Sequence, residues 1–315
     1  MPPSKRLHAA LRSSEPLDHL SLEYQEPQND NQRPYKHRSR KRREIQSVPT
    51  STRQLSLWNR RHELFGVRIA DATMNEAADL LDSYIEDNSP PRAVYFVNAH
   101  TLNCLFCTPG YTLPFQRAAT IFGDGVGVSI AMKVLHGLQP RDNVNGTDFL
   151  PFFLSRSQKK KRRIFLLGSA PGVARLAGQK ISIIHPNWQV VGSHHGFFQK
   201  SQSAELIKRI NSTQPDLLLV ALGNPLQEKW IDDNLQQLEV PVAMGVGALL
   251  EYLAGLKTRA PYWMRKRRLE WLYRMLFHKD KFLRYFLGNP LFLWRMAHAK
   301  LRQLKTDSHF RKPQD

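Results

Sequence analysis

The chain has 315 residues, enough for one large or two small domains with a hydrophobic core. It carries 46 Lys and Arg against 27 Asp and Glu, a formal charge of +19, which favours a polyanionic partner: nucleic acid, anionic lipid or a phosphorylated substrate. The sequence has no charge-free apolar run long enough to span a bilayer and no signal peptide, so we expect a cytosolic protein.

Residues 1–52 have the composition of a disordered basic arm. The segment is rich in Ser, Pro, Gln, Asn and Arg and shows no sustained apolar period. Its cluster Lys36-His37-Arg38-Ser39-Arg40-Lys41-Arg42-Arg43 suits nucleic acid, a nuclear signal or anionic lipid. No nucleic-acid-binding module follows the cluster, so we predict a solvated tail drawn to anionic membrane and no nucleic-acid partner.

From residue 53 to residue 255 the sequence alternates between short apolar strands and amphipathic helices. Strands nearly continuous in Val, Ile and Leu are typical of a parallel sheet covered by helices on both faces. We therefore predict an α/β core of about six strand–helix units. The predicted strands are 63–69 (a strand or hairpin), 93–97, 119–122, 164–167, 188–191, 216–222 and 242–246. The predicted helices are 75–85, 101–115 with a break at Pro109-Gly110, 128–135, 173–184, 204–210 and 229–238.

A glycine-rich turn with one carboxylate follows the predicted strand 119–122. In Gly123-Asp124-Gly125-Val126-Gly127, the glycines permit positive φ angles and close approach of another molecule to the main chain. A strand end, a carboxylate and a helix start together indicate the carboxyl edge of an open α/β sheet, where ligands bind. The alternative is an ordinary turn in which Asp124 caps the following helix.

Other turns that follow predicted strands bring further groups to this edge. Asn98 ends a strand and can hydrogen-bond a sugar or a nucleotide. Gln227 and Glu228 open a helix, whose free N–H groups favour an anion or a sugar hydroxyl; the alternative is helix capping by Asn224. Gly168 begins a Gly-x-x-x-Gly stretch, which lacks the spacing of the phosphate-binding loops of ATPases and NAD-dependent dehydrogenases and so disfavours both classes.

Neither cysteine is predicted to carry chemistry. A structural zinc site usually needs four ligands, and no second Cys or His pair has matching spacing. Cys104 and Cys107 lie in the apolar run 102–107, so we predict buried, reduced thiols. The sequence also lacks an Asp-x-Asp pair that would hold Mg²⁺ on a nucleotide, and we predict neither a metal nor a cofactor.

Residues 256–304 differ in character from the core. Aromatic side chains such as Trp263, Trp271 and Trp294 occur among many Lys and Arg, which suits a helical appendage lying at a membrane surface. The alternative is a helical subdomain packed on the core with its cations solvated. Gly288-Asn289-Pro290 is predicted to break the helix. Residues 305–315 are predicted to form a tail.

Six stretches together resemble the bacterial WecG/TagA/CpsF glycosyltransferase family, over roughly Leu64 to Arg284. The combination is specific where each piece alone is not. The stretches are Phe122-Gly-Asp124-Gly-Val-Gly127; Phe165-Leu-Leu-Gly168 with Pro171-Gly172-Val173; Val191-Gly192-Ser193-His194-His195-Gly196-Phe197-Phe198; Gly223-Asn-Pro225-Leu-Gln227-Glu228; Gly245-Val-Gly247 with Ala254-Gly255; and Arg259-Ala-Pro261 with Glu270-Trp-Leu-Tyr-Arg274.

The resemblance implies a Rossmann-like α/β domain with a C-terminal membrane-binding appendage. The family transfers a sugar from a UDP-sugar to a polyprenyl-diphosphate-linked sugar on the cytosolic face of the membrane, in cell-wall or exopolysaccharide assembly. It is regarded as inverting and metal-independent. The protein is accordingly expected to be cytoplasmic and peripheral on the inner face of the cytoplasmic membrane, and a homo-oligomer is left open.

The resemblance also implies roles for single residues. Asp124 matches the general base, which takes the acceptor hydroxyl proton as that oxygen attacks the anomeric carbon. Without a metal, arginines are the substitute that stabilises the leaving diphosphate. Three cations at i, i+7 and i+10 on one helix face match those of the family's appendage, although they can instead bind lipid phosphates. The predicted substrate-binding residues are Asn98, Gly125, Gly168, Gln227, Glu228, Arg259, Arg274, Lys281 and Arg284.

Four positions depart from the usual family pattern. Ala99-His100-Thr101 stands where Pro or Glu is common after the early Asn, and Lys281 stands where Arg is usual. Glu251 replaces a common Asp, and Asn143 replaces a frequent Arg. These departures leave the donor open among ManNAc, its uronic acid and a neutral hexose. The rival class is a non-catalytic protein that binds anionic membrane or nucleic acid.

Overall fold

We analysed a computed structural model, which describes residues 57, 59–87, 89–156, 160–267, 269–277 and 282–310. Within the last segment the side chains of residues 283, 284 and 306–310 are not described. The predicted N-terminal arm, residues 1–52, lies outside the described residues, as does Lys281. The described part of the chain from residue 57 onward belongs to one compact unit.

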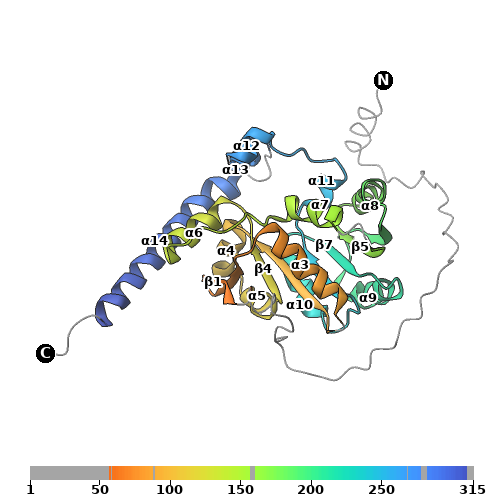
Figure 1. Ribbon diagram of the computed structural model, residues 1–315, viewed down its shortest axis with the longest axis horizontal. Helices are drawn as coiled ribbons and strands as arrows, with labels where there is room; N and C mark the ends of the chain where they lie inside the picture. The colour runs from red at the N-terminus through yellow and green to blue at the C-terminus, as the bar shows by residue number, and fades with distance from the viewer. Residues whose placement is uncertain are drawn as a thin grey trace. The chain divides into compact units, whose positions relative to one another are not determined.

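Eight strands form one sheet in the order β1-β2-β4-β3-β8-β7-β5-β6 (Figure 1). Only the first pair, a hairpin, is antiparallel; every other neighbouring pair is parallel. The predicted strands are therefore confirmed, including the hairpin. The strands are β1 (Arg61–Leu64), β2 (Val67–Ala70), β3 (Arg92–Val97), β4 (Thr120–Gly123), β5 (Arg162–Gly168), β6 (Trp188–His194), β7 (Leu217–Ala221) and β8 (Val242–Gly245).

Helices cover both faces of the sheet, because alternate residues of each central strand point into different apolar clusters. One cluster joins Val94 and Phe96 of β3 to helices α3, α7, α8 and α11; the other joins Ala93, Tyr95 and Val97 to helices α4, α5, α6, α9, α10 and α14. The predicted α/β fold is thus confirmed. The core helices are α3 (Met74–Glu86), α4 (Ala99–Cys107), α5 (Thr112–Arg117), α6 (Val126–His136), α7 (Gly146–Arg156), α8 (Val173–Ile184), α9 (Ser203–Ser212), preceded by the 3₁₀ turn η1 (Lys200–Gln202), α10 (Leu226–Asn234) and α11 (Leu249–Leu253).

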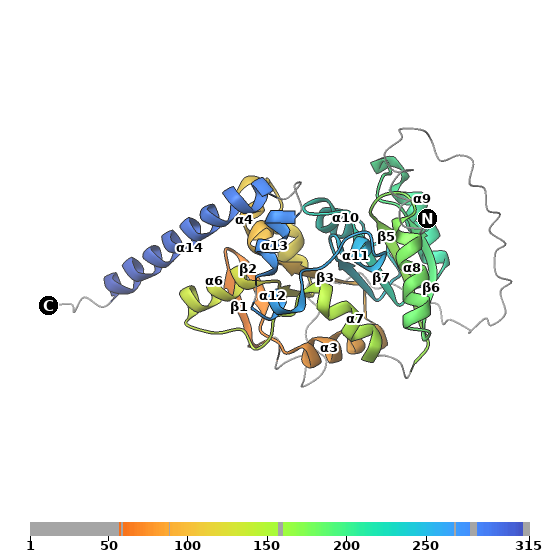
Figure 2. The ribbon, with the colours of Figure 1, turned by 90° about the horizontal axis from the view of Figure 1, so that it is seen from above.

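Three further helices, α12 (Tyr262–Lys266), α13 (Glu270–Phe277) and α14 (Phe282–Phe310), follow the core. Helix α14 lies beside α4 and α6 in both views (Figure 1, Figure 2). Its Phe292 and Met296 are buried in the same apolar cluster as α4 and α6. Among the described residues, no helix is both long and apolar enough to cross a bilayer.

The predicted helix break at Gly288-Asn289-Pro290 is wrong, because α14 continues through Pro290. A proline inside a helix removes one backbone hydrogen bond and costs about 3 kcal/mol. Contacts with α4 offset that cost here. The Asn103 side-chain amide donates to the Gly288 carbonyl oxygen at 2.7 Å, and the Arg295 guanidinium donates to both the backbone and side-chain oxygens of Asn103 at 2.8 Å.

The prediction that both thiols are buried is wrong for Cys107, which is exposed, and Cys104 is only half-buried. Neither Cys104 nor Cys107 forms a disulfide bond. Helix α4 buries Thr101, Leu102 and Asn103, which lie one turn before the two cysteines. An apolar run on a helix is buried only on the face that meets the sheet, and Cys107 lies outside that face.

Gly168 is predicted to contact substrate. In the structure, glycine is needed at this position because strand β7 lies too close to it to leave room for a side chain. Gly168 has φ +130°, and a Cβ atom there would lie 2.4 Å from the Ala221 carbonyl oxygen of β7. We expect Gly168→Ala to lower the free energy of unfolding by about 3 kcal/mol or more. Gly172→Ala is the control, since Gly172 has φ +83° but nothing within 4 Å, and should cost only about 1–2 kcal/mol. Urea titrations showing equal losses would contradict this assignment.

Candidate active site

The loops that follow neighbouring parallel strands meet at one edge of the sheet. Val97 of β3 lies in register with Gly123 of β4, so Asn98 and Asp124 leave adjacent strands. The Asp124 amide donates to the Val97 carbonyl oxygen at 2.7 Å. This edge is where an open α/β sheet binds its ligands.

Asp124 is partly exposed, and α6 begins at Val126 with Gly125 as its N-cap. Asp124 therefore does not stand at the N-cap position that the alternative of an ordinary capped turn expects. Gly125 has φ +92°, which favours glycine, and its amide donates to Asn143 Oδ1 at 2.7 Å. Asn143 therefore positions the loop that carries Asp124.

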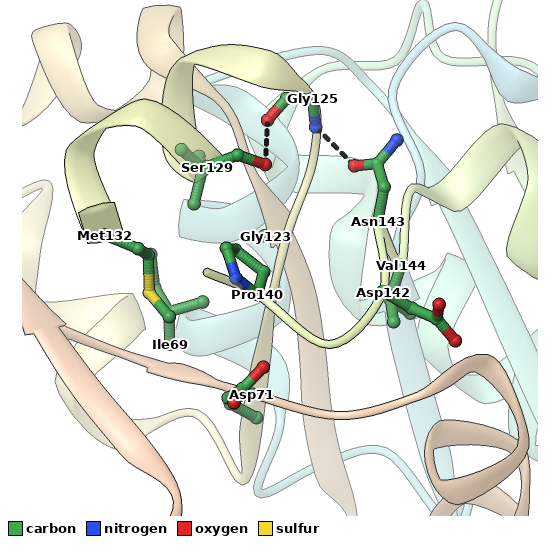
Figure 3. Close-up of a pocket in the computed structure, with 12 residues that line it drawn as sticks. Ile69, Asp71, Gly123, Gly125, Ser129, Met132, Pro140, Asp142, Asn143 and Val144 are labelled. Carbon is green, nitrogen blue, oxygen red and sulfur yellow. Dashed lines mark hydrogen bonds between the residues drawn. The ribbon is translucent and has the colours of Figure 1, made fainter. Parts of the chain in front are cut away.

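A small pocket lies against this loop (Figure 3). The apolar part of its lining includes Ile69 and Met132. Gly123 and Gly125 also line the pocket, whereas Asp124 does not. Asp71 also lines the pocket and accepts a hydrogen bond from the Arg141 amide at 2.8 Å. The complete lining is Ile69, Ala70, Asp71, Gly123, Gly125, Val128, Ser129, Met132, Pro140, Asp142, Asn143 and Val144.

A chain of alternating carboxylates and guanidinium groups links the core to α13. Arg259 pairs with Asp148 at the start of α7 and, through Nη2, with Glu270 Oε2 at 3.3 Å. The other carboxylate oxygen, Glu270 Oε1, accepts from Arg274 Nη2 at 2.7 Å. The side chains of Arg259 and Arg274 are 21% and 19% exposed, so both cations are well shielded from solvent.

Arg274 ends this chain, and Asp124 is among the groups whose charge acts on it. Burial lowers the pKa of the Arg274 guanidinium, but four acidic groups outweigh that effect and raise the pKa above its usual value: Glu270, Tyr252, Tyr285 and Asp124. The charge of Asp124 makes the smallest of these four contributions. The Nε atoms of Arg259 and Arg274 are buried without a hydrogen-bond partner.

Gln227 and Glu228 are brought to the same edge but are buried, with exposures of 2% and 0%. Gln227 Oε1 accepts from the Gly247 amide at 2.9 Å, and its Nε2 donates to Glu228 Oε1 at 2.7 Å. Glu228 also accepts from Tyr111 Oη at 2.9 Å and Asn224 Nδ2 at 2.6 Å. Burial raises the pKa of Glu228 to about 7. These contacts join the loops after β7 and β8.

The structure gives less information on three other residues that are predicted to bind substrate. Asn98 caps α4: its Oδ1 accepts from the His100 and Thr101 amides at 3.1 Å, which leaves its amide N–H groups for a ligand. Arg284 lies in α14, but its side chain is not among those described. Lys281 lies outside the described residues. Substrate contact by any of these residues stays a prediction.

The sequence reasoning assigned no role to Glu270 and Asp148 and noted Asn143 only as a departure from the family pattern. Glu270 stands four residues before Arg274 on one helix, a spacing that places the two side chains together and could have indicated the pair. Asp148 follows Asn145 by three residues and bonds to it at 2.8 Å, as in a helix-capping pair. The contacts of Glu270 and Asp148 with Arg259 have no comparable signal in the local sequence.

Among the described residues, no three His, Cys, Asp or Glu side chains lie together as a metal-binding group. Metal-independent chemistry stays a prediction. The arrangement is instead a partly exposed carboxylate at the carboxyl edge of a parallel sheet, together with a shielded guanidinium group on which the charge of that carboxylate acts. A base placed beside a group that stabilises negative charge is the basis of an enzyme site for group transfer.

The sequence model of the glycosyl transferase WecG/TagA/CpsF family matches residues 62–306, and the chain belongs to this family. It is therefore a glycosyltransferase, as predicted. Two similar proteins come from Staphylococcus aureus, strains NCTC 8325 and COL, and both are named N-acetylglucosaminyldiphosphoundecaprenol N-acetyl-beta-D-mannosaminyltransferase. Each is 30% identical over 246 residues, which cover 77% of this chain and 94% of the relative.

Proposed function

We propose that this protein transfers an N-acetylmannosaminyl or related hexosyl residue from a UDP-sugar to a polyprenyl-diphosphate-linked saccharide. The product would enter cell-surface or exopolysaccharide biosynthesis. The names of the Staphylococcus aureus relatives support the lipid-linked acceptor, and the β-linked sugar in those names supports inversion of an α-linked donor. The observation that carries the proposal is a partly exposed carboxylate, Asp124, in a glycine-rich loop at the carboxyl edge of the parallel sheet.

Asp124 acts as the general base. Its carboxylate accepts the proton of the acceptor hydroxyl while that oxygen attacks the anomeric carbon from the face opposite the leaving diphosphate. The new glycosidic C–O bond forms as the bond to the diphosphate oxygen breaks, so the configuration inverts. Proton transfer of this kind contributes about 10²- to 10⁴-fold to a rate.

Arg274 and Arg259 stabilise the leaving group. Negative charge develops on the diphosphate as the anomeric bond breaks, and cations in a shielded site stabilise such charge more strongly than they do in water. Both guanidinium groups are mostly buried, and the chain of ion pairs through Glu270 joins them to each other and to Asp148. They supply the positive charge that a metal ion provides in other transferases.

The helices after the core are suited to a membrane surface. Large apolar side chains on α12, α13 and α14 stay exposed, which is unusual unless a surface covers them. Basic side chains accompany them: the Arg265 and Arg267 guanidinium groups lie 5.7 Å and 5.9 Å from the Tyr262 and Trp263 ring centroids. The most exposed are Tyr262, Trp263, Leu276, Phe277, Phe286, Leu287, Trp294 and Leu301.

We expect the double substitution Trp263→Ala with Phe277→Ala to weaken binding to phosphatidylglycerol vesicles by at least about 50-fold, because each ring contributes roughly 1.5–3 kcal/mol when removed from water. The two side chains are 56% and 67% exposed, so the fold should be unaffected. Vesicle sedimentation measures the change. Ile183→Ala on α8, 79% exposed, is the control and should bind normally. Undiminished binding by the double variant would exclude this surface.

The proposed activity is tested with purified protein, membranes containing polyprenyl-diphosphate-linked GlcNAc and a panel of UDP-sugars. Mass spectrometry of the lipid product should show one added N-acetylhexosamine or hexose, with release of UDP that depends on the acceptor. Absence of transfer and of UDP release from every donor would overturn the proposal.

A further inference from the structure

Gly127 stands where the first turns of α4 and α6 meet. Its φ angle is not positive, so the backbone conformation at this position does not itself require glycine. A Cβ atom at residue 127 would lie 2.9 Å from the Ala99 Cβ atom of α4. That distance is well inside the about 3.5–4.0 Å at which two carbon atoms pack favourably. The close approach of the two helices therefore requires glycine here.

The two residues at this contact are neighbours of groups that are assigned to the reaction. Ala99 is the first residue of α4 and directly follows Asn98, which is predicted to bind substrate. Gly127 is the second residue of α6 and stands three residues after Asp124, the proposed base. Since β3 and β4 are adjacent and parallel, the separation of the two helix starts governs the distance between Asn98 and Asp124.

We propose that Gly127 is a positioning residue, which lets α6 begin close to α4 and so holds the Asp124 carboxylate at the distance from Asn98 that sugar transfer requires. The inference rests on the proposed function. A larger residue at position 127 would push the two helix starts apart and move the base away from the acceptor hydroxyl. A displacement of about 1 Å in a reacting group can lower a rate by about 100-fold.

An added Cβ atom should displace the start of α6 more than the start of α4. Asn98 caps α4 through two backbone amides, and Asn103 of the same helix donates to a backbone carbonyl oxygen of α14 at 2.7 Å. Phe292 of α14 also lies against this point, with its Cε1 atom 3.6 Å from the position of a Cβ atom at residue 127. Within the described part of the chain, no side chain caps the start of α6. The turn that carries Asp124 is therefore expected to move.

The test is Gly127→Ala, with kcat for sugar transfer and urea unfolding measured on the same protein. We expect kcat to fall about 10- to 100-fold, because the base is displaced. Gly178→Ala is the matched control, since a Cβ atom there would lie 3.0 Å from a Val190 methyl group. Helix α8, which carries Gly178, packs on β5 and β6, away from β4 in the sheet. The control should lower the urea midpoint and leave kcat near the wild-type value.

Three further variants separate positioning from packing. Gly127→Ala combined with Ala99→Gly exchanges the two side chains at the contact and should restore kcat to within about threefold of the wild type. Gly127→Ala made in the Asp124→Asn background should lower kcat by less than about threefold further, because the group that it displaces no longer acts as a base. Ala99→Val enlarges the contact from the α4 side and should reproduce the loss of kcat, which keeps the inference testable if Gly127→Ala does not fold.

Three results would overturn the inference. They are a wild-type kcat in Gly127→Ala or Ala99→Val, a double variant with Ala99→Gly that does not recover, and an equally large loss in the Asp124→Asn background. A wild-type protein that transfers no sugar would overturn the proposed function instead.

Discussion

Asp124→Asn should lower kcat for sugar transfer by about 10²- to 10⁴-fold, because the amide cannot accept the proton of the acceptor hydroxyl. The substitution conserves size, and Asp124 is partly exposed at the start of a loop held by Gly125 and Asn143. We therefore expect the fold and the dissociation constant for UDP to stay within about threefold of the wild type. Transfer is measured by acceptor-dependent UDP release, and binding by calorimetry.

The matched control for that experiment is Asp142→Asn. Asp142 lines the neighbouring pocket and bonds through Oδ2 to the Met74 amide at 2.9 Å. The same loss of charge at this position should reduce kcat far less, because no reacting atom is assigned to it. An Asp124→Asn enzyme with a near-normal rate would exclude Asp124 as the base.

Glu228→Ala should lower the free energy of unfolding by about 3–5 kcal/mol, the largest effect on stability that we expect. Truncation leaves two buried donors, on Tyr111 and Gln227, and a partly buried one on Asn224 without the carboxylate that now accepts from them. Glu228→Gln retains the size and one acceptor oxygen, so it should lose much less. Urea unfolding of both variants at pH 6 measures the difference.

The same carboxyl predicts how stability depends on pH. Its pKa in the folded protein, about 7, is above the ordinary value of 4.5, and the cause is burial. The stability linked to Glu228 is therefore complete below pH 4.5 and is lost as pH rises through 7. Glu228→Gln should remove this loss, so that the variant and the wild type diverge between pH 5 and pH 8. Parallel pH curves would contradict the assignment.

The α/β fold could be predicted from the sequence because its signals are local. Strands such as β3 and β7 are continuous apolar runs, and turns with Gly or Asn separate them from periodic helices. The position of Asp124 followed from the same rule, since a polar residue after a parallel strand must lie at the carboxyl edge. Neither conclusion needed knowledge of distant contacts.

Features that depend on distant contacts could not be predicted. Helix α14 passes through Pro290 where Asn103, 185 residues before Gly288, donates to the Gly288 carbonyl oxygen. Gln227 was expected to face substrate, yet the amide of Gly247 and the carboxylate of Glu228 occupy its polar atoms. The bridge from Arg259 to Asp148 spans 111 residues. Local propensity carries no information on such pairs.

The pH dependence of sugar transfer by Arg274→Gln tests most directly whether Asp124 and Arg274 act together. The charges of Arg274 and Asp124 act on each other, so we expect removal of the cation to disfavour the ionised form of Asp124. We therefore predict that the acid limb of the pH–rate profile moves to higher pH, with a lower maximal rate. An acid limb that stays at the wild-type pH, or moves to lower pH, would contradict the account.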